Sequence, residues 1–164
     1  MVSIGLLSDT HGYLPEAVFR HFDQVDEIWH AGDVGDLSVL EQLQAFKPLR
    51  GVYGNIDGPA VKAHFPLDNI FIMEGVKVLM RHIGGYPGRY APGVRDLIKK
   101  EKPRLFISGH SHILKVMYDE KLACLHMNPG AAGKQGWHQV QTLLKFRINE
   151  DQIMDCQVIE LGKR

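Results

Sequence analysis

The chain has 164 residues, of which 45% are hydrophobic and 23% are charged, and its 19 basic residues balance 19 acidic ones. This length and composition predict a single globular domain over residues 1–164, with a core large enough to fold without disulfide bonds. The zero net charge argues against a long nucleic acid as substrate. No apolar run approaches the ~20 residues of a membrane span, so we expect no membrane association.

The N-terminal segment and the cysteines indicate a cytoplasmic location. Residues 1–8 lack the basic and long apolar regions of a signal peptide and are typical of a first strand. The two cysteines, Cys124 and Cys156, are too few for a disulfide framework. Both lie in segments of alternating apolar residues, so we expect two buried free thiols.

The first half of the chain alternates strands with helices. Short apolar runs predict three buried strands, at Val2–Leu7, Glu27–Ala31 and Pro48–Tyr53. Two helices are predicted between them. The first is Pro15–Phe22, with proline in its first turn, and the second is capped by Asp36 or Ser38 and runs through Ala45. This order implies parallel strands joined by right-handed crossovers.

The second half is dominated by antiparallel hairpins. Three are predicted, at Ile70–Met80 around Glu74-Gly75, at Leu114–Met127 around Asp119-Glu120, and at Thr142–Ile159 around residues 149–151. A helix at Val94–Lys102 and a strand at Leu105–Ser108 lie between the first two hairpins. Two mixed sheets covered by helices are the expected result. The hairpins after residue 113 can pair their edge strands between chains, so a homodimer is also predicted.

Polar residues gather where the predicted strands stop. Ser8–Gly12 follows the first strand, His30–Asp33 the second and Gly54–Asp57 the third, and two later strands run into His82 and Ser108–His112. In open α/β sheets, ligands bind beyond the carboxyl ends of the strands. Each segment alone is compatible with a solvated strand tip, but five in succession favour a metal site.

The types of side chain narrow the choice of metal. The candidate ligands, which offer an oxygen or an imidazole nitrogen, are Asp9, His11, Asp33, Asn55, His82, His110 and His112. A set rich in imidazoles and without thiolates suits Mn, Fe, Zn, Co or Ni rather than Ca or Mg. These ligands are too many for one tetrahedral ion, and they fit two ions ~3.5–4 Å apart that share a carboxylate. His110 and His112 point to the same side of an extended segment, so each can serve one ion.

As a set, Asp9-x-His11, Gly32-Asp33, Gly54-Asn55, His82 and Gly109-His110-x-His112 resemble the motifs of the calcineurin-like metallophosphoesterases. Asn128-Pro129-Gly130, which predicts a turn, resembles a further motif of the small bacterial and archaeal phosphodiesterase branch. The resemblance implies an α/β fold, namely a four-layer αββα sandwich of two mixed β-sheets flanked by helices. It places the metal site at the carboxyl ends of the strands.

The resemblance also implies a role for each ligand. The first metal would take Asp9, His11 and His112, Asp33 would bridge, and the second metal would take Asn55, His82 and His110. In the family, a metal-bridging hydroxide attacks phosphorus in line, so Asp33, Asn55 and His82 are the residues expected to serve catalysis with it. Manganese is the favoured identity of the two divalent ions, with Fe, Zn, Ni or Co as alternatives.

The chain departs from the family pattern at two positions. Many members carry a histidine after the Gly-Asn pair that helps the leaving group depart, whereas this chain has Ile56, which cannot transfer a proton. We therefore expect better activity on phosphodiesters with activated leaving groups. The next residue, Asp57, is expected to orient its own loop. Arg81 stands where a glycine usually precedes the histidine, and we expect its side chain to point to solvent.

The segment Gly84–Gly93 is rich in glycine and proline, which predicts a loop without regular structure beside the site. Arg89 is the candidate to bind a substrate phosphate, and Tyr86 or Tyr90 to stack on a base. The alternative is an ordered rim loop that contacts no substrate.

The histidines outside the ligand set receive ordinary roles. His30 and His126 are predicted either to support the site or to pack in the core. The remaining three, His21, His64 and His138, are predicted to lie at the surface.

The leading functional hypothesis is a dinuclear-metal phosphodiesterase that acts on a nucleotide, a cyclic nucleotide or another small phosphodiester. The alternative is a non-catalytic scaffold, because the retromer subunit of this fold resembles the enzymes but serves in protein assembly with an altered metal site. Every ligand position of this chain holds a competent residue, which favours the enzyme.

Overall fold

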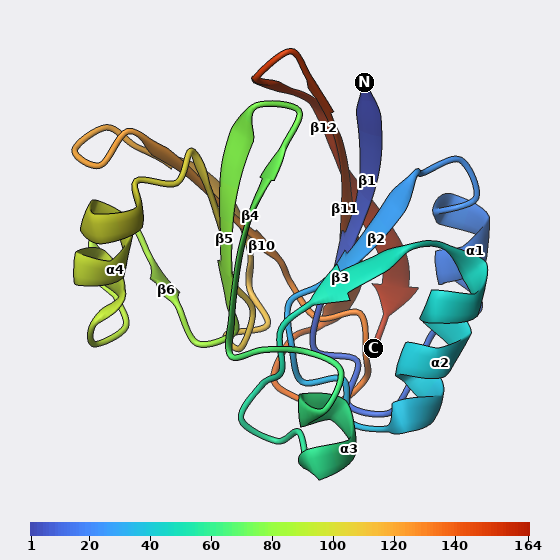
Figure 1. The fold of residues 1–164 in the computed structure, drawn as a ribbon. Helices are drawn as coiled ribbons and strands as arrows, with labels where there is room; N and C mark the ends of the chain where they lie inside the picture. The colour runs from blue at the N-terminus through green and yellow to red at the C-terminus, as the bar shows by residue number, and fades with distance from the viewer.

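The computed structural model describes all 164 residues, and its first sheet is built around the N-terminal strands (Figure 1). Its strands, in the order β12-β11-β1-β2-β3, are Val2–Leu7 (β1), Glu27–His30 (β2), Leu49–Gly51 (β3), Val140–Asn149 (β11) and Gln152–Lys163 (β12). β1, β2 and β3 are parallel, as the alternation of strands and helices predicted. The C-terminal hairpin β11–β12 completes the sheet through antiparallel pairing of β11 with β1.

The second sheet has the order β4-β5-β8-β10-β9. Its strands are Asp68–Met73 (β4), Val76–Arg81 (β5), Leu105–Ile107 (β8), Leu114–Asp119 (β9) and Cys124–Pro129 (β10). β5, β8 and β10 are parallel, and antiparallel hairpins add the edge strands β4 and β9. The turn of the β4–β5 hairpin is the predicted Glu74-Gly75 pair, with φ of 49° and 82°, the left-handed conformation that tight hairpins need.

Helices cover the outer faces of both sheets (Figure 1). Their bounds are Ala17–His21 (α1), Leu37–Phe46 (α2), Pro59–Lys62 (α3) and Val94–Glu101 (α4). α1 and α2 lie on the first sheet and α4 on the second. Asp36, the first of the two predicted caps, accepts a 3.2 Å hydrogen bond from the backbone N–H of Ser38 and so fixes the start of α2. None of the helices is long and apolar enough to cross a membrane.

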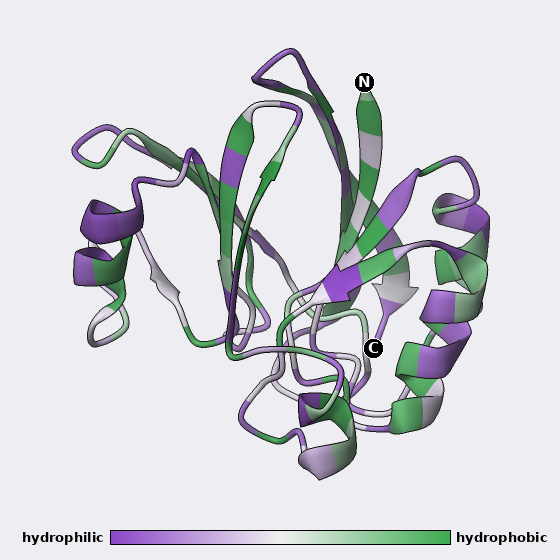
Figure 2. Cartoon of the chain, viewed as in Figure 1, coloured by the Kyte–Doolittle hydropathy of each residue, from purple (hydrophilic) through white to green (hydrophobic).

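Three apolar layers hold the four structural layers together. Buried residues of both sheets, among them Trp29 and Phe146, pack between the sheets. A second cluster joins the first sheet to α1 and α2, and a third joins the second sheet to α4 through Val94 and Ile98. Figure 2 shows α4 as mostly hydrophilic with a hydrophobic strip on the side of the sheet. Each large side chain that is fully buried contributes about 1.5–3 kcal/mol to the stability of the fold. The order of the strands confirms the predicted αββα sandwich.

The segment Gly84–Gly93 is not irregular, so this prediction is wrong. It forms a small hairpin of Gly85–Tyr86 (β6) and Arg89–Tyr90 (β7). Gly85 and Gly88 adopt φ of 70° and 90°. The glycines that suggested irregular structure are the residues that permit so tight a turn.

Other boundaries also differ from the predictions. α1 begins at Ala17 rather than Pro15, because the Pro15 carbonyl closes a turn with the N–H of Val18 at 3.1 Å. β3 ends at Gly51 rather than at Tyr53, because the N–H of Tyr53 donates its hydrogen bond to the carbonyl of Pro66 at 3.0 Å. The short helix α3 was not predicted.

Two further predictions in the second half need correction. Asn128 and Pro129 belong to the end of β10 rather than to a turn, and Gly130 alone follows with φ of 73°. Cys124 is a buried free thiol, as predicted, but Cys156 is exposed because β12 is an edge strand with one face toward solvent. β9 and β12 supply the free edges that a dimer would need, and the homodimer stays a prediction.

Candidate metal centre

All seven candidate ligands lie just beyond the carboxyl ends of five strands. Asp9 and His11 follow β1, Asp33 follows β2, and Asn55 follows β3 in the first sheet. In the second sheet, His82 follows β5, and the pair His110 and His112 follows β8. Six of the seven form two groups, Asp9–His11–His112 and Asp33–His82–His110, and the ligand atoms within each group lie within 4.8 Å of one another.

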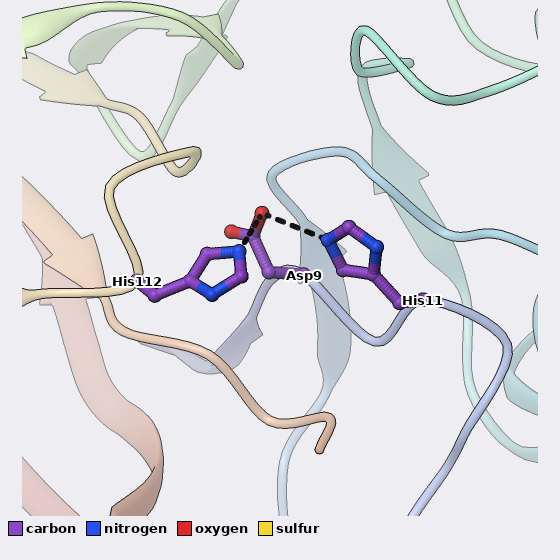
Figure 3. A group of neighbouring side chains, drawn as sticks. All are labelled: Asp9, His11 and His112. Carbon is purple, nitrogen blue, oxygen red and sulfur yellow. Dashed lines mark ion pairs between the residues drawn. The ribbon is translucent and has the colours of Figure 1, made fainter. Parts of the chain in front are cut away.

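The first group converges on a single carboxylate oxygen (Figure 3). The Nε2 of His112 lies 3.2 Å from Oδ1 of Asp9, and the Nε2 of His11 lies 3.8 Å from the same oxygen. Asp9 is fully buried, and the side chains of His11 and His112 are only 9% and 13% exposed. Oxygen and nitrogen ligands from loops far apart in sequence therefore meet in a nearly closed space.

The second group shares a carboxylate with the first. Oδ2 of Asp33 lies 3.1 Å from Nε2 of His82 and 3.4 Å from Nε2 of His11, which belongs to the first group. Asn55 joins the second group through its Oδ1, which lies 3.0 Å from Nδ1 of His110. Asp33 thus stands between the two groups, where the resemblance placed the bridging ligand.

Each carboxylate has one oxygen held by the protein and one turned to the centre. Oδ2 of Asp9 accepts hydrogen bonds from the Ser8 hydroxyl at 2.6 Å and from the N–H of His110 at 3.1 Å. Oδ1 of Asp33 accepts a 3.1 Å bond from the N–H of Ile56. The other oxygens, Oδ1 of Asp9 and Oδ2 of Asp33, are those that face the histidines.

Three buried polar atoms of the centre test whether cations fit. Oδ1 of Asp9, Nε2 of His11 and Nε2 of His82 are buried and have no hydrogen-bond partner. A buried polar atom without a partner costs about 1–3 kcal/mol, so three in one place require an explanation. Ligands held about 2.1 Å from one cation lie roughly 3–4 Å from one another, which is the range of separations found here. The donor set therefore fits bound divalent cations.

One histidine of the centre is already oriented for ligation. Nδ1 of His82 donates a 2.7 Å hydrogen bond to the carbonyl of Ala31. A neutral imidazole that donates from Nδ1 keeps its lone pair on Nε2, the atom that faces Asp33. The ring therefore presents a ligand atom without any further rearrangement.

The pKa values of the centre are shifted in opposite directions. Burial raises the pKa of Asp9, but the neighbouring imidazoles of His11, His112 and His82 outweigh burial and hold this pKa well below its usual range. The pKa of Asp33 is lowered in the same way, mainly by His82 against the effect of burial. The neighbouring Asp9 carboxylate raises the pKa of His11 against burial. Burial lowers the pKa of His82, but the carboxylates of Asp33 and Asp9 outweigh burial and raise it. Both carboxylates are ionised at neutral pH, as cation ligands must be.

Backbone strain is concentrated at the candidate ligands. Five of them have positive φ, namely Asp9 (55°), His11 (46°), Asp33 (56°), His110 (71°) and His112 (62°). Residues other than glycine adopt this conformation at a cost of order 1–3 kcal/mol, and such residues cluster at functional sites. The backbone at the strand ends therefore adopts a less stable conformation, which directs these side chains toward one point.

Two buried residues tie the ligand loops together. The carboxylate of Asp57 accepts bonds from the N–H groups of Gly54 (2.8 Å), Val34 (3.2 Å) and Gly35 (2.9 Å). It thus orients its own loop, as predicted, and also the loop that follows Asp33. His30 lies beneath the site, 3.0 Å from the Thr10 hydroxyl and 3.1 Å from the N–H of Gly32, and burial lowers the pKa of His30 to about 4.

His138, which was predicted to lie at the surface, lies beside the centre instead. Its ring is half-buried and packs edge-on against His112, with ring centroids 5.1 Å apart. Its Nε2 donates a 2.8 Å bond to the carbonyl of Gly133, and Nδ1 is buried without a partner. A glycine, Gly136, precedes it by two residues and lies so close to His112 that a Cβ there would overlap the ring. A glycine also stands directly before a candidate ligand in Gly32-Asp33, Gly54-Asn55 and Gly109-His110.

The remaining histidines have no contact with the ligands. His126 is buried, and its Nδ1 donates a 3.2 Å bond to the carbonyl of Phe106 in the core. His64 is exposed, as predicted, whereas His21 is half-buried at the end of α1.

The three residues proposed from sequence to meet substrate form no hydrogen bond or ion pair with the ligands. Arg89 is exposed on β7 and forms no hydrogen bond or ion pair with them, so its phosphate role stays a prediction. The hydroxyl of Tyr90 donates a 2.6 Å hydrogen bond to Asp119, and the ammonium of Lys115 lies 4.1 Å from the centre of the Tyr86 ring. Both tyrosines are therefore engaged with β9.

Arg81 does not point to solvent, so this prediction is wrong. Its guanidinium forms two parallel hydrogen bonds with Asp68, from Nε to Oδ1 at 2.5 Å and from Nη2 to Oδ2 at 2.6 Å. The two residues face each other in the ladder of β4 and β5.

Comparison with known proteins gives a consistent result. A family model described as the calcineurin-like phosphoesterase superfamily domain matches residues 2–151. A probable metallophosphoesterase from the archaeon Methanothermobacter thermautotrophicus is 33% identical over 168 aligned positions, which cover 97% of this chain and 92% of that protein.

Solved structures share the fold at lower identity. An archaeal phosphodiesterase superposes with a TM-score of 0.77 at 22% identity, over 97% of this chain and 99% of that one. Vps29 from Entamoeba histolytica, solved in complex with Zn²⁺, gives a TM-score of 0.75 at 13% identity, over 96% of this chain and 98% of that one. At these identities the likeness shows the fold alone.

Proposed function

The chain belongs to the calcineurin-like phosphoesterase superfamily, and from this premise we propose that it hydrolyses small phosphodiesters with the help of two divalent transition-metal ions. One observation carries the proposal. Two groups of ligand atoms meet across Asp33, and three of their buried atoms have no hydrogen-bond partner.

The chain's own residues would hold the two ions as follows. Asp9, His11 and His112 would hold the first, and Asn55, His82 and His110 the second, with Asp33 between them. When bound, such ions activate water as a nucleophile near neutral pH and neutralise charge on the phosphoryl oxygens. Manganese is the favoured identity, since the set mixes imidazole nitrogen with carboxylate and amide oxygen.

The surrounding residues fix the geometry in advance. The Ser8 hydroxyl and the N–H of His110 hold Asp9, and the N–H of Ile56 holds Asp33, so neither carboxylate has to rotate when a ligand arrives. The carbonyl of Ala31 keeps the proton of His82 on Nδ1. Preorganisation of this kind lowers the reorganisation cost of the reaction.

The position after Asn55 limits the choice of ester. Ile56 is 46% exposed at the edge of the site and has no proton to give to a departing alkoxide. Phosphodiesters whose leaving groups depart without protonation are therefore the best substrates in this proposal. An aryl diester meets this description best, because an aryloxide departs without protonation, whereas the ribose alkoxide of a nucleotide or cyclic nucleotide departs less readily.

The proposal is tested by the hydrolysis of bis(p-nitrophenyl) phosphate with Mn²⁺, Fe²⁺, Zn²⁺, Ni²⁺ or Co²⁺ added to purified protein from which metal has been stripped. We expect metal-dependent turnover that Asp33→Ala abolishes, while Asp96→Asn, at an exposed carboxylate on α4, leaves it unchanged. Absence of turnover with every metal, in a sample that circular dichroism shows to be folded, would contradict the proposal.

That negative outcome would favour the second candidate, a non-catalytic scaffold. The observation behind it is the shared fold with Vps29, at a TM-score of 0.75. A scaffold that binds metal without turnover would still show the two-site metal binding described below, so only the kinetic assay separates the two candidates.

A further inference from the structure

A cavity of about 320 Å³ opens beside the second group of ligands, and no residue role proposed above uses it. It is lined by two candidate ligands, Asn55 and His82, whereas the other sizeable cavities contain none. Its remaining walls come from both sheets: Tyr53 and Lys62 from the loop and helix after β3, and Arg81 from the end of β5. Anything held at the second group therefore has this cavity as its neighbour.

The walls of the cavity are largely apolar. Leu67, Ile83, Ala91 and Pro92 line it, and Leu67 and Ile83 are 49% and 42% exposed. Apolar side chains that are grouped in a hollow beside a polar centre offer contact area to a ligand. Apolar walls with a few polar groups, at volumes from about 300 Å³ upward, are typical of small-molecule sites.

The charge of the cavity comes from one residue. Arg81 is compensated by its two hydrogen bonds with Asp68. Lys62 forms no ion pair, and its ammonium lies 5.1 Å from the centre of the Tyr53 ring. One uncompensated positive charge at the mouth of an apolar cavity favours a ligand that is apolar at one end and anionic at the other.

We propose that this cavity is a substituent pocket that receives an aromatic or nucleoside substituent of the phosphoester while its phosphoryl group lies at the second group of ligands. Leu67 and Ile83 pack against the substituent, and Lys62 attracts the anionic group. The inference rests on the proposed function, because that function places the phosphoryl group at the metal centre.

The test measures how tightly two phosphonates bind to the Mn²⁺-loaded protein by isothermal titration calorimetry. Phenylphosphonate and methylphosphonate share the anionic group and differ only in the substituent. We expect the phenyl compound to bind at least about tenfold tighter, since even one methylene in an apolar pocket is worth about tenfold or more. Adenosine monophosphate should show an advantage of at least the same size.

Variants of the pocket test whether its walls cause the tighter binding of phenylphosphonate. The double variant Leu67→Asn/Ile83→Asn should reduce the phenyl advantage below about threefold, because it replaces two apolar walls with polar amides. The matched control is Ile72→Asn, at an isoleucine that is 70% exposed on β4 outside the pocket, and it should preserve the advantage. Lys62→Gln should weaken both phosphonates by a similar factor.

The outcomes separate the pocket from the proposed function. Equal binding of the two phosphonates to the wild-type protein, or an undiminished phenyl advantage in the folded double variant, would overturn the substituent pocket and leave the proposed function standing. If neither phosphonate binds and no diester is hydrolysed, the proposed function fails and the pocket falls with it.

Discussion

The two groups of candidate ligands differ in how far they are open to solvent. In the first group Asp9 is fully buried, and Gly136 and His138 close the space behind His112. In the second group His110 and Asn55 are exposed, and the substituent pocket adjoins them. In the proposed function this difference divides the roles: the closed group would hold its cation firmly, and the open group would meet substrate.

Asp33 belongs to both groups, so its removal should have the largest effect. Asp33→Asn keeps the size of the side chain and its bond to the N–H of Ile56 but removes the charge that faces His11 and His82. We expect kcat/KM for bis(p-nitrophenyl) phosphate to fall by about 10³-fold, the loss typical of one key electrostatic contact. A loss below tenfold would show that the two groups do not work through this carboxylate.

Removal of a ligand from one group should leave the other group occupied. Asp9→Asn removes the carboxylate on which the first group converges, and Asn55→Ala removes an oxygen of the second group. Each should weaken one of two Mn²⁺ sites by about 100-fold, the upper end of the range for altered metal shells. Equilibrium dialysis should count two Mn²⁺ in the wild-type protein and one in each variant, and simultaneous loss of both would break the distinction between the groups.

Two histidines of the centre, His11 and His82, differ from His126 of the core in the sign of their pKa shifts. Carboxylates raise the pKa of His11 and His82, whereas burial lowers that of His126 to about 4. The pKa of His126 in the folded protein lies below its unfolded value of 6.5. As the pH falls, His126 therefore takes up a proton in the unfolded chain before it does so in the folded protein. Its contribution to stability is complete above pH 6.5 and is lost as the pH falls toward 4.

We therefore expect His126 alone to remove about 2 kcal/mol of unfolding free energy between pH 7 and pH 5. His126→Phe should show a correspondingly flatter dependence of unfolding free energy on pH, measured by urea denaturation at each pH. The baseline stability of the variant can be lower, since the bond to the carbonyl of Phe106 is lost. Parallel pH curves for the two proteins would show that His126 titrates normally.

A variant of His138 tests whether this residue supports metal binding by the closed first group. Loss of its ring in His138→Ala opens the space beside His112 and should weaken the first Mn²⁺ site by about tenfold, as removal of a supporting residue does. The second site should be unaffected. His64→Ala, at an exposed histidine, is the control and should change neither site. Equal binding by both variants would mean that His138 does not support the closed group.

The sequence predicted the centre better than its surroundings, for a physical reason. Ligands at strand ends are marked by residue type and by position after an apolar run, so Asp9, Asp33 and His82 could be found because five such segments follow one another in the chain. The partners of Arg81 and His138 are set by the pairing of β4 with β5 and by the path of the chain after β10. No local pattern encodes such contacts.

The backbone conformation of the ligands could not be predicted from the sequence either. The positive φ of Asp33 and His112 opposes the preference of both residue types, and only the packing around the strand ends enforces it. The hairpin at Gly84–Gly93 was missed because glycine predicts turns and irregular loops equally well. Cys156 was placed in the core because an edge strand and a central strand share the same alternation.

The central claim is that two cations lie on either side of Asp33. Crystals grown with Mn²⁺ and measured at a wavelength where manganese scatters anomalously test it most directly. We predict two anomalous peaks, one among Asp9, His11 and His112 and the other among Asn55, His82 and His110. A single peak, or none at these side chains, would contradict the account.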